Sequence, residues 1–186
     1  IMRRGNVPLF WGDPAGLDYL ATLEYPLVTT QNYSALNDTE RQLLSPNNKR
    51  TVTNYANKIA AKLGLQKPCI GFFRRRPNIA TCLGEFITGS ETECPTMVVS
   101  LKHASTEVLK DSVAHELAHA FQWTQLSHGM WDLDDAEGAA ENFCYDIRYM
   151  GLDEAVEILA RVCDRAIRDN DAAVLNAGLE DDNDDA

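Results

Sequence analysis

The sequence predicts an α+β fold, in which a small, mostly antiparallel sheet of about three strands packs on one helix and is followed by supporting helices. Apolar residues recur every three or four positions in 46–63 and again from 106 onwards, which is typical of amphipathic helices. Between these segments lie three short apolar runs separated by turn residues, as in strands. Because the strands form one block, the order favours α+β over alternating α/β.

The segment before the predicted sheet divides into an arm and two helices. Residues 1–35 are rich in Gly, Pro and aromatic residues without a clear period, which predicts an irregular N-terminal arm. A short helix is expected from Asp38 to Leu44. Ser45 followed by Pro46 favours the start of a longer helix, since Ser caps the first turn and Pro fits within it, and Gly64 favours its end.

The three predicted strands are Cys69–Phe73, Ile79–Ile87 and Thr96–Leu101. Turn-forming residues at 76–78 and 89–91 separate them. Three short strands in a row indicate a small, mostly antiparallel sheet.

The remainder of the chain has the pattern of helices. Ser105 or Thr106 is placed to cap a helix that carries the most informative motif of the sequence. A second helix is expected from about 135 to 150, ending at Gly151, and a third from Asp153 onwards. These elements predict three consecutive helices after the sheet.

Length and charge limit the possible partners. The 186 residues suit one domain, predicted at 36–170, followed by an acidic tail at 171–186 that we expect to be disordered. The net charge of −11 disfavours nucleic acid as a partner, because affinity for phosphates comes from Lys and Arg. No stretch approaches the roughly 18 apolar residues of a membrane span, so none is expected.

Cysteine usage gives an expectation about compartment. Five cysteines without a CxxC pair imply neither a closed disulfide framework nor a zinc knuckle. We therefore predict reduced thiols and a cytoplasmic location. A secreted protein whose signal segment has been removed is the alternative.

The most informative motif is His115-Glu116-Leu117-Ala118-His119. On a helix, His115 and His119 lie one turn apart on the same face and can bind one metal ion. Glu116 lies beside them, in position to take a proton from a metal-bound water. This HExxH pattern is typical of zinc peptidases.

A catalytic zinc needs three protein ligands and one open position, so a third ligand must come from further along the chain. Glu137 and Glu141 share a helix face, and we favour Glu137 as the ligand. Glu141 would then accept a hydrogen bond from the far ring nitrogen of a ligand histidine. His128, nine residues after His119, is the alternative third ligand.

Several segments resemble those of gluzincins, the zinc peptidases that combine HExxH with a downstream Glu, and of their M48 and minigluzincin-like families in particular. The segments that carry the resemblance are 115–119, 137–141, the segment 76–80 followed by the strand at 96–101, and the helix–Gly–helix step at 149–155. The resemblance covers about residues 68–168. Glu141 stands where the group usually has Asp, and a layout like that of the ImmA/IrrE group also fits.

The resemblance implies a zincin-like metallopeptidase domain with one zinc ion and a peptide or protein as substrate. Glu116 would act as general base toward the metal-activated water. The strand at 79–87 would form the edge of the cleft, where an extended substrate can add as a further strand. Candidates to stabilise the oxyanion are His128, Tyr145, Arg148 and Tyr149.

Three alternatives remain open from the sequence. A SprT-like protease would use His128 as the third ligand. A non-catalytic, zinc-stabilised module would bind a peptide or protein without cleaving it. An N-terminal arm at 1–35 that covers the cleft would keep an active enzyme latent.

Overall fold

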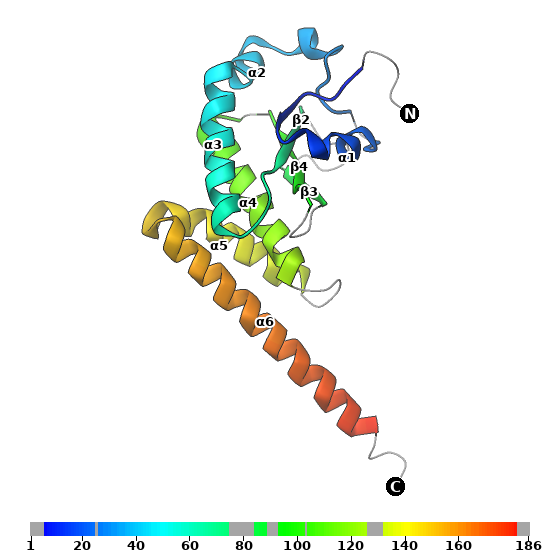
Figure 1. Ribbon diagram of the computed structural model, residues 1–186, viewed down its shortest axis with the longest axis vertical. Helices are drawn as coiled ribbons and strands as arrows, with labels where there is room; N and C mark the ends of the chain where they lie inside the picture. Colours follow the sequence, from blue (N-terminus) through cyan, green and yellow to red (C-terminus); the bar gives the residue numbers. More distant parts are fainter. Residues whose placement is uncertain are drawn as a thin grey trace.

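The structure is a computed structural model with a mixed α/β fold (Figure 1). The residues that it describes are 6–24, 26–74, 84–88, 93–102, 104–125 and 132–181, with the backbone alone described for 84–88, 133 and 179–181.

The described strands form one sheet in the order β1-β2-β4-β3. They are β1 (Phe10–Gly12), β2 (Cys69–Phe73), β3 (Gly84–Thr88) and β4 (Thr96–Ser100). β1 and β3 are antiparallel to their neighbours, whereas β2 and β4 pair in parallel, with Cys69 opposite Thr96. The sheet is thus mixed: its two outer pairs are antiparallel and its central pair is parallel. All residues of β2 and β4 are buried, and strands buried on both faces belong in the middle of a sheet.

Alternate side chains of the central strands separate the core into two clusters. The larger cluster lies on the face covered by α3 and α4, and its strand residues are Ile70, Phe72, Met97 and Val99. The smaller cluster lies on the other face, where Cys69, Phe73 and Val98 meet Leu20 and Leu27. This two-residue period is what a strand imposes on its side chains.

The N-terminal arm is more regular than its sequence indicated. It supplies β1, the 3-10 turns Pro14–Gly16 and Tyr33–Ala35, and the short helix α1 (Leu17–Ala21). Trp11 holds β1 in place: it is buried and makes an edge contact with Phe72 at 4.6 Å between ring centroids. Such elements are too short to show a period, so tertiary contacts determine them.

The described part of the arm packs on both faces of the sheet. Leu20 of α1 packs over Gly71, where an added Cβ would lie 2.9 Å from a Leu20 methyl group, and it belongs to the smaller cluster. Trp11 and Val28 belong to the larger cluster, which also includes residues of α4.

Two capped helices connect the arm to the sheet. α2 (Asp38–Leu43) begins with a capping box between Asn37 and Glu40, and α3 (Pro46–Lys62) begins at the predicted Ser45 cap. The buried Glu40 also accepts two hydrogen bonds from Arg74, at 2.7 and 2.9 Å, which connects α2 to the end of β2.

The three predicted helices after the sheet are present. They are α4 (Thr106–Gln125), α5 (Leu133–Met150) and α6 (Leu152–Asp181). Gly151 separates α5 from α6 with a φ of 91°, a conformation that favours glycine. None of the described helices is long and apolar enough to span a membrane.

The length of α6 corrects one prediction. The acidic segment from 171 was expected to be disordered, but α6 continues through 171–181 and extends past the other helices in Figure 1. Its last two turns before residue 179 are exposed, and the helix includes Ala172, Ala173 and Ala177. Alanine has the highest helix propensity, which outweighs the charge pattern here.

Candidate metal centre

The two histidines of the HExxH motif lie on α4, where the helical period brings them onto one face. Their side chains are mostly buried, with 17% of each exposed. His115 Nε2 lies 3.1 Å from His119 Nε2, and the rings meet edge-on. Both side chains therefore direct the same ring nitrogen toward one point.

Glu137 reaches the same point from the first turns of α5. Its Oε1 lies 2.7 Å from His119 Nε2, and its Oε2 lies 3.2 Å from His115 Nε2. One donor atom from each of the three residues lies within 4.8 Å of the others. The structure thus brings together the three ligands that the sequence predicted.

Small side chains allow α4 and α5 to approach closely enough for this arrangement. Ala114 and Ala118 on α4 and Ala140 on α5 are fully buried, and Phe143 packs beside them. Gly138, also on α5, is exposed, and a Cβ added there would meet nothing within 4 Å.

Gln122 determines the tautomer of His119. Its Nε2 donates to the Ala136 carbonyl at 2.9 Å, so its Oε1 must face His119 Nδ1, at 2.8 Å. A carbonyl oxygen only accepts, and therefore Nδ1 carries a proton, which leaves Nε2 as the nitrogen that can bind a metal. Because Ala136 precedes Glu137, Gln122 also positions the third ligand.

The donor atoms of this group need a cation among them. The Nε2 lone pair of His119 faces a carboxylate oxygen of Glu137 at 2.7 Å, and two acceptors repel at that distance. A shared proton or a metal ion removes the repulsion. Ligands about 2.0–2.2 Å from a tetrahedral zinc lie about 3.3 Å apart. The separations here are 2.7–3.2 Å and involve both oxygens of Glu137, so the side chains would have to move apart slightly to hold an ion. The types of donor, two imidazoles and one carboxylate, fit a metal such as zinc.

The environment of His115 favours its neutral form. Burial lowers the pKa of His115 and the neighbouring His119 lowers it further, whereas Glu137 and Glu141 raise it. A metal binds the neutral ring, so the lowered pKa favours binding. Because its pKa is lower in the folded protein, His115 binds a proton more readily in the unfolded chain. Its contribution therefore lowers the free energy of unfolding as pH falls through about 6.5, the ordinary pKa of histidine.

Glu141 lies where the sequence placed it, beside the far nitrogen of His115. Its Oε2 is 3.6 Å from His115 Nδ1, slightly beyond hydrogen-bond distance. Glu141 thus lies beside Nδ1 of His115, and Gln122 lies beside Nδ1 of His119. Gln122 was not predicted, although it lies three residues after His119 and so shares its helix face.

The other predicted residues differ in burial and in partners. Glu116 is buried, with 5% of the residue exposed, and its charge helps to raise the pKa of Cys144 on α5, after the larger effect of burial. Arg148 pairs with Asp111 of α4, not with a member of the group. Tyr145 and Tyr149 are 50% and 82% exposed. His128 lies outside the described residues.

Gln122→Met should weaken metal binding by roughly 10–100-fold, as loss of a residue that orients a ligand histidine typically does. The methionine retains the volume but removes the acceptor for His119 Nδ1. Competition with a coloured chelator measures the affinity. Gln125→Met, at the exposed end of the same helix, is the matched control. Equal affinity in the two variants would show that Gln122 does not position His119.

Comparisons with protein-family models, curated proteins and solved structures found no match for this chain.

Proposed function

We propose that this protein is a zinc-dependent endopeptidase of the gluzincin type with a zincin-like domain. The observation that carries the proposal is the convergence of His115 and His119 from α4 with Glu137 from α5, with one donor atom of each within 4.8 Å of the others. Two imidazoles and one carboxylate are a ligand set of catalytic zinc, and three protein ligands leave a position for water.

Bound zinc would acidify a water molecule and polarise the carbonyl of the scissile peptide bond. Glu116 follows the first ligand directly, and its role is to hold the proton taken from the water and to pass it to the leaving amine. Tyr145, Tyr149, Arg148 and His128 remain candidates to stabilise the oxyanion.

The sheet offers a place for an extended substrate. β3 is the outermost described strand on its side and packs against α4, the helix of His115 and His119. An outermost strand presents backbone donors and acceptors that an extended peptide can pair with. This arrangement supports a polypeptide as the substrate class.

Hydrolysis should depend on the metal. We expect the purified protein to cleave unfolded casein, to lose this activity with an excess of chelator, and to regain it with stoichiometric zinc. Metal analysis of the untreated protein identifies the native ion. Activity that persists after complete removal of metal would exclude a metallopeptidase.

A second candidate is a non-catalytic module that metal stabilises and that binds a peptide or protein. The near-complete burial of Glu116 favours it, since a general base must reach the reacting water. In that case, chelation would lower the thermal midpoint of unfolding, while no condition would produce cleavage.

A further inference from the structure

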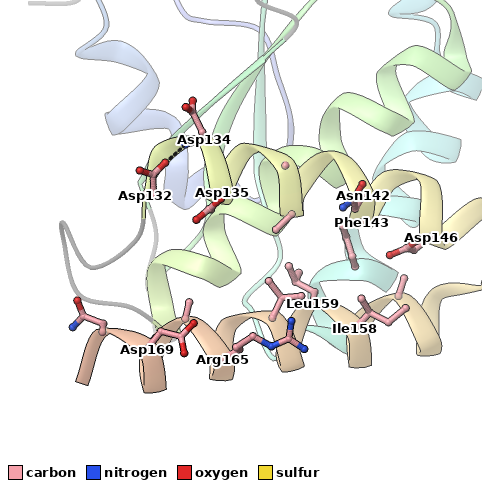
Figure 2. Close-up of a pocket in the computed structure, with 16 residues that line it drawn as sticks. Asp132, Asp134, Asp135, Asn142, Phe143, Asp146, Ile158, Leu159, Arg165 and Asp169 are labelled. Atoms are coloured by element: carbon pink, nitrogen blue, oxygen red, sulfur yellow. Dashed lines mark hydrogen bonds between the residues drawn. The ribbon is translucent and has the colours of Figure 1, made fainter. Parts of the chain in front are cut away.

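A groove of about 710 Å³ lies between α5 and α6, separate from the metal centre. Figure 2 shows that its residues come from both helices and face one another across the space between them. His115, His119, Glu137 and Glu141 are not among its lining residues. The groove therefore has no part in the chemistry proposed above.

The floor of the groove is apolar. Its lining includes Phe143 and Leu159, which belong to the main core, and Ile158 and Val162 beside them. Gly138 and Ala139 are the small residues on the α5 side, and a Cβ added at Gly138 would meet nothing within 4 Å. Covering an apolar surface of this kind with another apolar surface is favourable, because both are removed from water.

The rim of the groove is acidic. Asp132, Asp134 and Asp135 line it at the start of α5, and Asp169 lies on α6. In Figure 2 Asp132 and Asp135 lie on the side toward Asp169, whereas the carboxylate of Asp134 points away from α6. Including Asp146, five aspartates line the groove with one arginine, Arg165. A partner that covers the floor must therefore carry positive charge at its edges.

We propose that this groove binds a basic amphipathic helix of a partner protein. Leucine-like side chains on one face of that helix would pack on Ile158 and Val162, which are partly exposed, whereas Phe143 and Leu159 beneath them are buried. Lysine or arginine at its flanks would pair with the aspartates of the rim. Helix-in-groove binding of this type combines an apolar contact with charge recognition.

A second copy of this chain is a poorer occupant. α6 carries eight acidic and three basic residues, and the whole chain has a net charge of −11. Packing α6 of one copy into the groove of another would place like charges together at short distance. Charge complementarity thus selects a basic partner over self-association.

Binding of a labelled model peptide tests the proposal without any need for hydrolysis. The probe is a helix of about 18 residues, some 27 Å long, with leucines on one face and lysines on the other. Fluorescence anisotropy should show saturable binding that weakens as salt increases. A leucine/glutamate peptide of the same pattern, and a lysine/serine peptide without an apolar face, should bind at least about tenfold more weakly.

Two variants locate the binding. Gly138→Leu adds a side chain into the groove, and Gly178→Leu makes the same change on α6 outside it; neither glycine has a neighbour within 4 Å of an added Cβ. Gly138→Leu should weaken peptide binding at least about tenfold and Gly178→Leu should not. If Gly138→Leu does not fold, Asp135→Asn with Asp169→Asn should weaken binding and reduce its dependence on salt.

Three results would overturn the proposal. One is equal affinity of the parent and the groove variants for the leucine/lysine peptide. Another is equal affinity for the lysine/serine peptide, which would show unspecific attraction between charges. The third is a dimer in sedimentation that Gly138→Leu dissociates, which would assign the groove to a second copy.

Discussion

Glu116→Gln is expected to retain its metal and to lower the rate of peptide hydrolysis by roughly 10²–10⁴-fold, the usual contribution of a general base. The amide preserves the size of the buried side chain but cannot take a proton. The three predicted ligand side chains, His115, His119 and Glu137, remain in place, so metal content should stay at one equivalent. The loss should appear in kcat more than in KM, because the missing step follows substrate binding.

The measurement combines metal analysis with steady-state hydrolysis of a fluorogenic peptide. Glu107→Gln is the matched control, since Glu107 lies in the first turn of the same helix with 68% of its side chain exposed. It should retain full activity. A Glu116→Gln protein as active as its parent would remove Glu116 from the mechanism, and one that loses its metal would assign Glu116 a structural role.

Some elements of the fold could be predicted from the sequence and others could not. α3, α4 and α5 were predictable because long amphipathic segments with caps repeat their signal over several turns. β1 was not, because three residues carry no period and its position depends on Trp11 packing against Phe72. The parallel pairing of β2 and β4 was also missed, since pairing depends on which strands are buried on both faces.

The site was predictable where the helical period alone determines it. The spacing of His115 and His119 places them on one face of α4, and that of Glu137 and Glu141 places them on one face of α5. That these two faces meet depends on how the helices pack, which the sequence only indicated through its alanines. The bond from Gln122 to the Ala136 carbonyl joins backbone and side chain across that contact, so no spacing rule reveals it.

Glu137→Ala is expected to lower metal affinity by at least about 10²-fold, more than the loss of a residue that merely orients a ligand. Glu137 is the carboxylate that contacts both histidines, at 2.7 and 3.2 Å. Glu141→Ala is the graded comparison, because Glu141 lies one turn later with similar exposure but contacts only the far nitrogen of His115. Its effect should be at most about 10–100-fold.

Metal content after dialysis and affinity against a chelator measure these effects, and His128→Ala tests the alternative ligand. If the Glu137→Ala protein retained its metal and the His128→Ala protein lost it, the third metal ligand would be His128 and not Glu137. Protonation of the histidines cannot mimic the expected result. Glu137 raises the pKa of His115, so its removal makes that ring still less inclined to bind a proton. Loss of metal at neutral pH would therefore reflect the missing carboxylate ligand itself.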